Sequence, residues 1–368
     1  MDRKEGTICN CQRGSELEAR SPSCILLRAA FSHLFLRRNT AGIYILSILM
    51  IQTFIIRLTY FVLPVLVFAG LGDIILSRTL KESKIFASGE YPVWNDLYGG
   101  KISNEIVIYG SSRAVVQIDP RIIEDSLQQS CYNLGIDGHN FWLQYFRHKE
   151  FLSYNKVPKL IIHSLDVTTL TDRGDLFNSD QFLPYLLLDK TIQSNTQDYN
   201  FFSGWDFKVP MVRFMGNERA MLHAAKLLFK EQPDTVGRIN GYQAEPKTWN
   251  ADFEIARKKL PTYNIEVDSG ALNLFKSYLR ECSDQQIRII FVYTPQYIEG
   301  QQFIQNKEYI LNIYRSLGKA YNIPFLDYSD DPICQSKVYF YNSGHLNKVG
   351  SALFTRNLGH DLKEYIHN

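Results

Sequence analysis

The chain has 368 residues, of which 45% are hydrophobic, 21% charged and 13% aromatic. This composition is typical of a globular protein and excludes a disordered or collagen-like chain. Forty Lys and Arg against 38 Asp and Glu leave a formal charge of +2, too little for the broad basic field of a nucleic-acid-binding protein. The mean hydropathy of -0.19 excludes a protein made mostly of membrane spans, so we expect one large domain or two ordinary ones with at most a span or two.

The cysteines predict neither a disulfide framework nor a metal site. The chain has six, scattered at Cys9, Cys11, Cys24, Cys131, Cys282 and Cys334. Cys9 and Cys11 are separated by one residue where zinc-binding pairs have two or more, and no second Cys/His pair follows at zinc-finger spacing. We therefore expect no bound metal and no cofactor.

Residues 43–76 form an almost continuous apolar run, interrupted only by Arg57 and Asp73. A helix crosses a bilayer with about 20 apolar residues, so the run is too long for one upright helix and too short for two helices with a turn. We expect a single transmembrane helix. A buried core helix would rarely run so long without a polar face, and a cleaved signal peptide would need a small-residue cleavage site after the run.

The charges that flank the run predict its orientation. Arg28, Arg37 and Arg38 precede it, and a weaker mixture of Lys, Arg and Glu follows. Because basic residues next to a span tend to stay inside, we expect a cytoplasmic tail at 1–42 and a periplasmic or otherwise extracytoplasmic C-terminal domain. Met50 stands directly before an arrangement of short tail and anchor, which leads to the hypothesis that translation starts there. A peptide from residues 1–49 in the native protein would reject that hypothesis.

After a polar connector at 77–104, the chain alternates short apolar runs with longer helix-like stretches. The expected strands are 105–109, 131–134, 160–164, 288–293 and 323–326, rich in Ile, Val, Phe and Tyr. This alternation indicates an α/β fold, a three-layer flavodoxin-like sandwich with a central parallel sheet of about five strands, over residues 105–368. Helices are expected after Asp119-Pro120 and at 140–154, 218–230 and 269–282, with an insertion at about 171–268.

Three turns carry candidate chemistry. The first expected strand ends in Gly110-Ser111-Ser112, and the second leads into Asn133-Leu-Gly135 and Gly138. Near the C-terminus, Asn342 and His345 precede the last helix. Ligands of open α/β sheets bind beyond the carboxyl ends of the strands, where the first two turns would lie. Each motif also has a plain structural explanation, because serine and glycine are common in tight turns.

In this order, the three segments resemble the SGNH/GDSL hydrolase superfamily over about residues 105–358, and most closely its membrane-anchored members that acylate or deacylate cell-envelope polysaccharides. The resemblance implies that Ser112 is the nucleophile, that the backbone N–H groups of Ser112 and Gly138 bind the oxyanion, and that His345 is the base. It also implies a multi-span membrane acyltransferase as a partner.

Two departures from the family pattern stand out. Asn342 occupies the position of the catalytic Asp, so it can orient the imidazole but cannot stabilise imidazolium with a charge; Asp327, Asp330 and Asp331 are the candidate replacement acids. The third block has His163-Ser-Leu-Asp166 in place of Gly-x-Asn-Asp, which removes an oxyanion donor.

Asp166 is expected to hold either a loop, as an Asx turn, or a polar group of the substrate. Arg113 is expected either to bind an anionic group of the substrate or to form a surface salt bridge.

Two functions remain open at this point. The chain is expected to be a serine esterase or O-acyltransferase that acts on an envelope polysaccharide through an acyl-Ser112 intermediate. The alternative is a degenerate member of the same fold that binds or assembles polysaccharide, which Asn342 and the altered third block favour.

Overall fold

The computed structural model describes residues 22–199, 201–229, 237–260 and 262–366, with side chains from residue 44 onward. The chain divides into two units, Met1–Phe68 and Ala69–Asn368. The expected tail lies outside the described residues up to position 21, as do Cys9 and Cys11, and the side chain of Cys24 is likewise outside them.

The apolar run lies within helix α1 (Pro22–Lys81), which begins earlier and ends later than the expected span. The part Tyr44–Lys81 is long and apolar enough to cross a membrane. Leu71, Ile74 and Ile75 are exposed, as are the large apolar side chains from Tyr44 to Phe68. Beyond that point the helix belongs to the second unit, where Asp73 forms a buried two-bond ion pair with Arg213 at 2.6 and 2.7 Å.

The second unit is built on a sheet of five parallel strands in the order β2-β1-β3-β4-β5. The strands are β1 (Ile106–Gly110), β2 (Cys131–Asn133), β3 (Leu160–Leu165), β4 (Arg288–Tyr293) and β5 (Phe325–Asp327). This is the flavodoxin-like strand order. The predicted α/β fold is confirmed, and all five strands lie within two residues of their expected positions because each is an apolar run bounded by turn residues.

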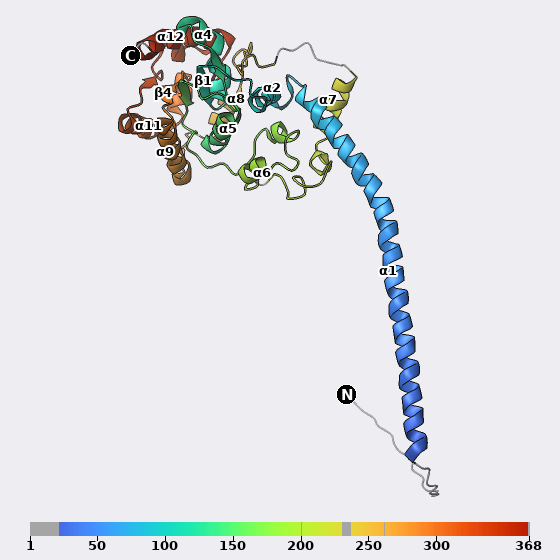
Figure 1. The fold of residues 1–368 in the computed structure, drawn as a ribbon. Coiled ribbons are helices and arrows are strands. Elements are labelled where there is room, and N and C mark those ends of the chain that lie inside the picture. The colour runs from blue at the N-terminus through green and yellow to red at the C-terminus, as the bar shows by residue number, and fades with distance from the viewer. Residues whose placement is uncertain (1–21, 200, 230–236, 261, 367–368) are drawn as a thin grey trace, which may run out of the picture. The chain divides into compact units, whose positions relative to one another are not determined.

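Helices cover both faces of the sheet (Figure 1). On one face, β-strand side chains such as Val107 and Phe291 pack with α2 (Phe86–Tyr98), α5 (Phe141–Tyr154), α9 (Ser269–Asp284) and α11 (Lys307–Tyr321). On the other, side chains such as Ile108 and Val292 pack with α3 (Ser112–Gln117), α4 (Pro120–Leu127) and α12 (Lys348–Ile366). Alternate residues of each strand therefore serve opposite layers, which makes the three-layer sandwich.

The segment 77–104 is more than the connector that the sequence predicts. It contains helix α2, whose Tyr91, Trp94 and Leu97 are buried in the core. Gly89 and Pro92 interrupt the helical pattern of the sequence, which is why this helix is not predicted. In the structure, the three residues from Ala87 to Gly89 have positive φ angles of 52, 55 and 68°.

The expected insertion contains the short helices η1 (Ser179–Phe182), α6 (Lys190–Thr196), η2 (Val212–Phe214), α7 (Glu218–Leu228) and α8 (Asp252–Lys259). Leu183, Phe214 and Ala224 from this region form a small core with Leu80 of α1 and Tyr91 of α2. Elsewhere lie α10 (Ile298–Gln302), η3 (Pro332–Gln335), η4 (Lys337–Tyr339) and a hairpin of β6 (Phe340–Asn342) and β7 (His345–Leu346). The end of α1 is thus held inside the folded unit.

Candidate active site

The first turn places two serines beyond the carboxyl end of β1. Gly110, the last residue of the strand, has φ +142° and lies so close to β3 that a Cβ would approach the Ser164 carbonyl oxygen to 2.5 Å. Ser111 then caps α3 by accepting a bond from the backbone of Arg113. Ser112 begins the helix, with its side chain facing the site.

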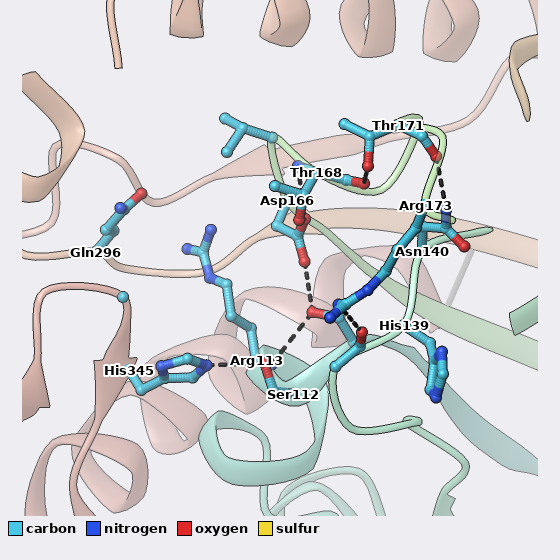
Figure 2. A pocket seen from close by; sticks show the side chains of 14 residues that line it. Ser112, Arg113, His139, Asn140, Asp166, Thr168, Thr171, Arg173, Gln296 and His345 are labelled. Atoms are coloured by element: carbon cyan, nitrogen blue, oxygen red, sulfur yellow. Dashed lines mark hydrogen bonds between the residues drawn. The ribbon is translucent and has the colours of Figure 1, made fainter. Parts of the chain in front are cut away.

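The C-terminal hairpin brings His345 to this serine. Nε2 of His345 lies 2.8 Å from Oγ of Ser112 across 233 positions of sequence, and Figure 2 shows the imidazole turned toward Ser112. Nδ1 of the same ring lies 2.9 Å from Oδ1 of Asn342. The structure thus aligns the three residues that the motifs singled out as hydroxyl, imidazole and amide.

The surroundings of His345 favour a neutral ring. Burial and the nearby positive charge of Arg113 lower the pKa of His345 to about 4, because both disfavour imidazolium. Tyr341 stacks on the ring with centroids 5.4 Å apart. A neutral imidazole can accept a proton from Ser112, which is what a general base must do.

Asn133 ties the first turn to the second. Its side-chain NH₂ donates to the carbonyl oxygens of Ala114 and Ile118, at 2.7 and 3.0 Å, and its Oδ1 accepts from the N–H of Gly135 at 2.9 Å. One buried amide therefore fixes the turn after β2 against the helix that begins with Ser112.

Gly138 lies beside Ser112 and His345 in the same pocket. It has φ +73°, and a Cβ there would come within 2.1 Å of the Phe177 ring, so no other residue fits without rearrangement. Among the hydrogen bonds of the described residues, the backbone N–H groups of Ser112 and Gly138 have no partner. The two residues whose N–H groups are expected to bind an oxyanion therefore line one cavity.

Asp166 forms an Asx turn. Its Oδ1 accepts from the backbone N–H and hydroxyl of Thr168, at 2.8 and 2.6 Å, and its Oδ2 accepts from the Ser111 hydroxyl at 2.5 Å. Only 4% of the residue is exposed. The carboxylate therefore holds the loop after β3 and the turn with Ser111 and Ser112 together, as expected for an Asp that holds a loop.

Among the residues that the structure describes, Arg113 has no salt-bridge partner. It is buried, donates to the carbonyl oxygens of Thr294 and Pro295, and lies over the Tyr293 ring at 4.7 Å. It also borders the pocket, and its buried Nε has no partner among the described atoms. The positive charge of Arg113 helps to lower the pKa of His345.

The three candidate replacement acids do not serve His345. Asp327 pairs with Arg315 at 2.7 Å, Asp330 is exposed, and Asp331 caps η3 through the N–H of Ile333. In the part of the chain that the structure describes, the hydrogen bond recorded for Nδ1 of His345 is the one to Asn342.

The pocket beside Ser112 holds about 240 Å³ and includes residues that the motifs missed: His139, Asn140, Thr168, Thr171, Arg173 and Gln296. A second pocket meets Ser112 and His345 from another side and is lined also by Asp137, Glu245, Lys247 and Tyr341. Arg173, Glu245 and Lys247 come from the insertion, where no motif marked them. Among the described residues, no group of three or more His, Cys, Asp or Glu is placed to hold a metal.

No family model and no curated protein matches the sequence. Among solved structures, the chain is similar to an acetyl xylan esterase (13% identity, TM-score 0.35, covering 71% of this chain and 99% of that one). It is also similar to a GDSL-like lipase from Bacteroides thetaiotaomicron (11% identity, TM-score 0.30, covering 71% of this chain and 87% of that one).

Proposed function

We propose that the chain is a serine esterase or O-acyltransferase of the SGNH type. The observation that carries the proposal is the 2.8 Å contact between Ser112 Oγ and His345 Nε2, which matches the reach required of a nucleophile and its base. Ser112 and Gly138 line the same pocket, and their backbone N–H groups would bind the oxyanion beside this contact.

The reaction follows from this geometry. Ser112 Oγ attacks an ester carbonyl while His345 Nε2 takes its proton, and the N–H groups of Ser112 and Gly138 hold the resulting oxyanion. Collapse breaks the ester bond, and the leaving alcohol takes the proton from His345. Water or a second hydroxyl then gives its proton to His345 and attacks the acyl-Ser112 carbonyl. As the bond to Ser112 Oγ breaks, His345 returns that proton to Oγ, and both residues are back in their starting forms. Water makes the chain an esterase, and a sugar hydroxyl makes it an acyltransferase.

We further propose an envelope polysaccharide as the substrate. A body anchored through α1 to the membrane and facing away from the cytoplasm would meet such polymers. The pockets around Ser112 are lined by hydroxyl, amide and charged side chains together with the apolar Val115, Val116 and Phe177. The polar groups suit the hydroxyl groups of a sugar polymer, and the apolar ones can contact its ring faces. If the acyl group comes from inside the cell, a multi-span acyltransferase would have to deliver it.

Asn342 favours a second candidate function, that of a catalytically degenerate polysaccharide-binding protein. A neutral amide stabilises imidazolium less than a carboxylate does, so the step that charges His345 is less favoured. Such a protein would keep the pockets without turning over an ester.

A fluorophosphonate probe distinguishes the two, because it reacts with an activated serine. The full chain in detergent should gain one adduct by intact mass, and Ser112→Ala and His345→Ala should both abolish it. Ser111→Ala is the matched control and should keep it. A folded wild-type chain that stays unlabelled would move the assignment to the binding protein.

A further inference from the structure

A buried charge cluster lies behind the turn that carries Gly138. Glu90 of α2 accepts bonds from Arg147 Nη2 at 2.6 Å and from Arg238 Nη2 at 2.5 Å. The side chain of Glu90 is fully buried, and those of the two arginines are 1% and 0% exposed. Burial acts to raise the pKa of Glu90, but the two arginines outweigh it and lower that pKa, so the carboxylate is charged at neutral pH.

All three side chains also contact the backbone of the turn. Arg147 Nη1 and Arg238 Nη1 both donate to the carbonyl oxygen of Gly135, at 2.9 and 3.2 Å. Oε1 of Glu90 accepts from the backbone N–H of Asp137 at 3.1 Å. The cluster therefore holds the backbone of the turn at Gly135 and at Asp137, and Asp137 directly precedes Gly138.

Burying these three charged groups costs desolvation free energy that an apolar core would not. Buried ion pairs lose much of their attraction to desolvation, and well-packed apolar residues of similar size often give equal or greater stability. Here one carboxylate faces two guanidinium groups, and most of their remaining bonds go to backbone atoms of Gly135, Asp137 and Ser88. Arg147 Nη2 also donates to the Gln181 side chain at 3.4 Å. Positioning of the backbone accounts for an arrangement that stability alone does not.

We propose that Glu90 is a positioning residue for the oxyanion site. Through Arg147, Arg238 and its own bond to Asp137, it fixes the turn so that the Gly138 N–H points into the pocket beside Ser112. The inference rests on the proposed esterase or acyltransferase function. It also assigns a catalytic consequence to α2, the first helix after α1.

The chain offers a matched control for the loss of a buried carboxylate. Asp73 is also buried and paired with an arginine, Arg213, but its bonds go to the backbone of Met211 and to Ser77 and Arg213, not to the turn. Asp73→Asn therefore removes a comparable ion pair without touching Gly135 or Asp137.

The test uses the full chain in detergent with p-nitrophenyl acetate, comparing Glu90→Gln, Arg238→Lys and Asp73→Asn with wild type. Arg238→Lys keeps the charge but replaces three nitrogens, Nε, Nη1 and Nη2, that bond Ser88, Gly135 and Glu90 by a single ammonium nitrogen. It serves if Glu90→Gln does not fold. Turnover is expressed per folded molecule, and hydrogen exchange is followed on peptides covering 134–140.

We expect Glu90→Gln and Arg238→Lys to lower kcat about 10- to 100-fold with KM nearly constant, since a small displacement of an oriented group costs up to about 10²-fold. The acid limb of the pH profile should stay in place, and exchange at 134–140 should accelerate. Asp73→Asn should change none of these. Folded turn variants with wild-type kcat and exchange, or an equal loss in Asp73→Asn, would overturn the inference. A wild-type chain without turnover would instead refute the proposed function, while the exchange data would still report on the turn.

Discussion

One oxygen of Asn342 orients His345. Oδ1 of Asn342 accepts from the backbone N–H of Gly344 at 3.0 Å and lies 2.9 Å from Nδ1 of His345. Because a backbone N–H can only donate, it fixes which end of the amide faces the ring. Nδ1 must therefore carry the proton, and Nε2 is left to accept from Ser112. The Asp-to-Asn departure thus removes a charge but preserves the catalytically useful tautomer.

Restoring the carboxylate should raise activity. Asn342→Asp keeps both acceptor bonds and adds a negative charge beside the ring, so we expect kcat for p-nitrophenyl acetate to rise about 10-fold or more, since hydrogen bonds to charged groups exceed neutral ones by about 1 to 1.5 kcal/mol. Stopped-flow or steady-state hydrolysis measures this. Asn342→Ala, which removes the acceptor altogether, should lower kcat, and a fall in Asn342→Asp as well would contradict the assigned role.

The pH dependence should follow the lowered pKa of His345. The neutral ring is the active form, so kcat/KM should be constant near neutrality and fall only as the pH drops through about 4, rather than near the ordinary value of about 6.5. In Asn342→Asp the added charge favours imidazolium, so the acid limb should move to higher pH. A wild-type limb at the ordinary histidine value would contradict the environment described for the ring.

Gly138 should tolerate no side chain. Gly138→Ala forces a residue with a Cβ to φ +73° and against Phe177, which should displace the oxyanion donor and lower kcat about 10²-fold. Gly174→Ala is the control, because a Cβ there meets nothing within 4 Å, and it should behave as wild type. Equal activity of the two variants would exclude Gly138 from the oxyanion site.

Of the two adjacent serines, Ser111 should contribute to stability and Ser112 to catalysis. Ser111→Ala removes a hydroxyl that Asp166 accepts from, so we expect a loss of about 1 to 3 kcal/mol in the free energy of unfolding, with the nucleophile retained. Ser112→Ala should leave stability within about 1 kcal/mol of wild type and abolish turnover. Denaturant titration and ester hydrolysis measure the two effects, and the opposite pattern would make Ser111 the nucleophile.

Much of the fold was readable from the sequence because its signals are local. Each strand is an apolar run, and Asp119 with Pro120 marks the start of α4 as predicted. Helix α2 was missed because its buried face includes a charged residue, Glu90, whose partner Arg238 lies 148 positions away. No local pattern can report such a pair.

Some residues of the site can also be predicted from local motifs, whereas others depend on the tertiary structure. Ser112, Gly138 and His345 stand in recognisable turns, and the sheet brings the first two together because parallel strands end at one edge. The contributions of Arg173 and Lys247 depend on how the insertion folds back over that edge. The orientation of Asn342 depends on one backbone N–H, which the sequence does not show.

The most direct measurement is the capture of the acyl-enzyme itself. The full chain should be mixed with p-nitrophenyl acetate, quenched in acid within milliseconds, digested and analysed by mass spectrometry, with His345→Ala as the control. An acetyl group on Ser112 in the wild type, and its absence in His345→Ala, is the predicted result. Ester turnover without acetyl-Ser112, or acetylation that persists in His345→Ala, would contradict a Ser112–His345 nucleophile and base.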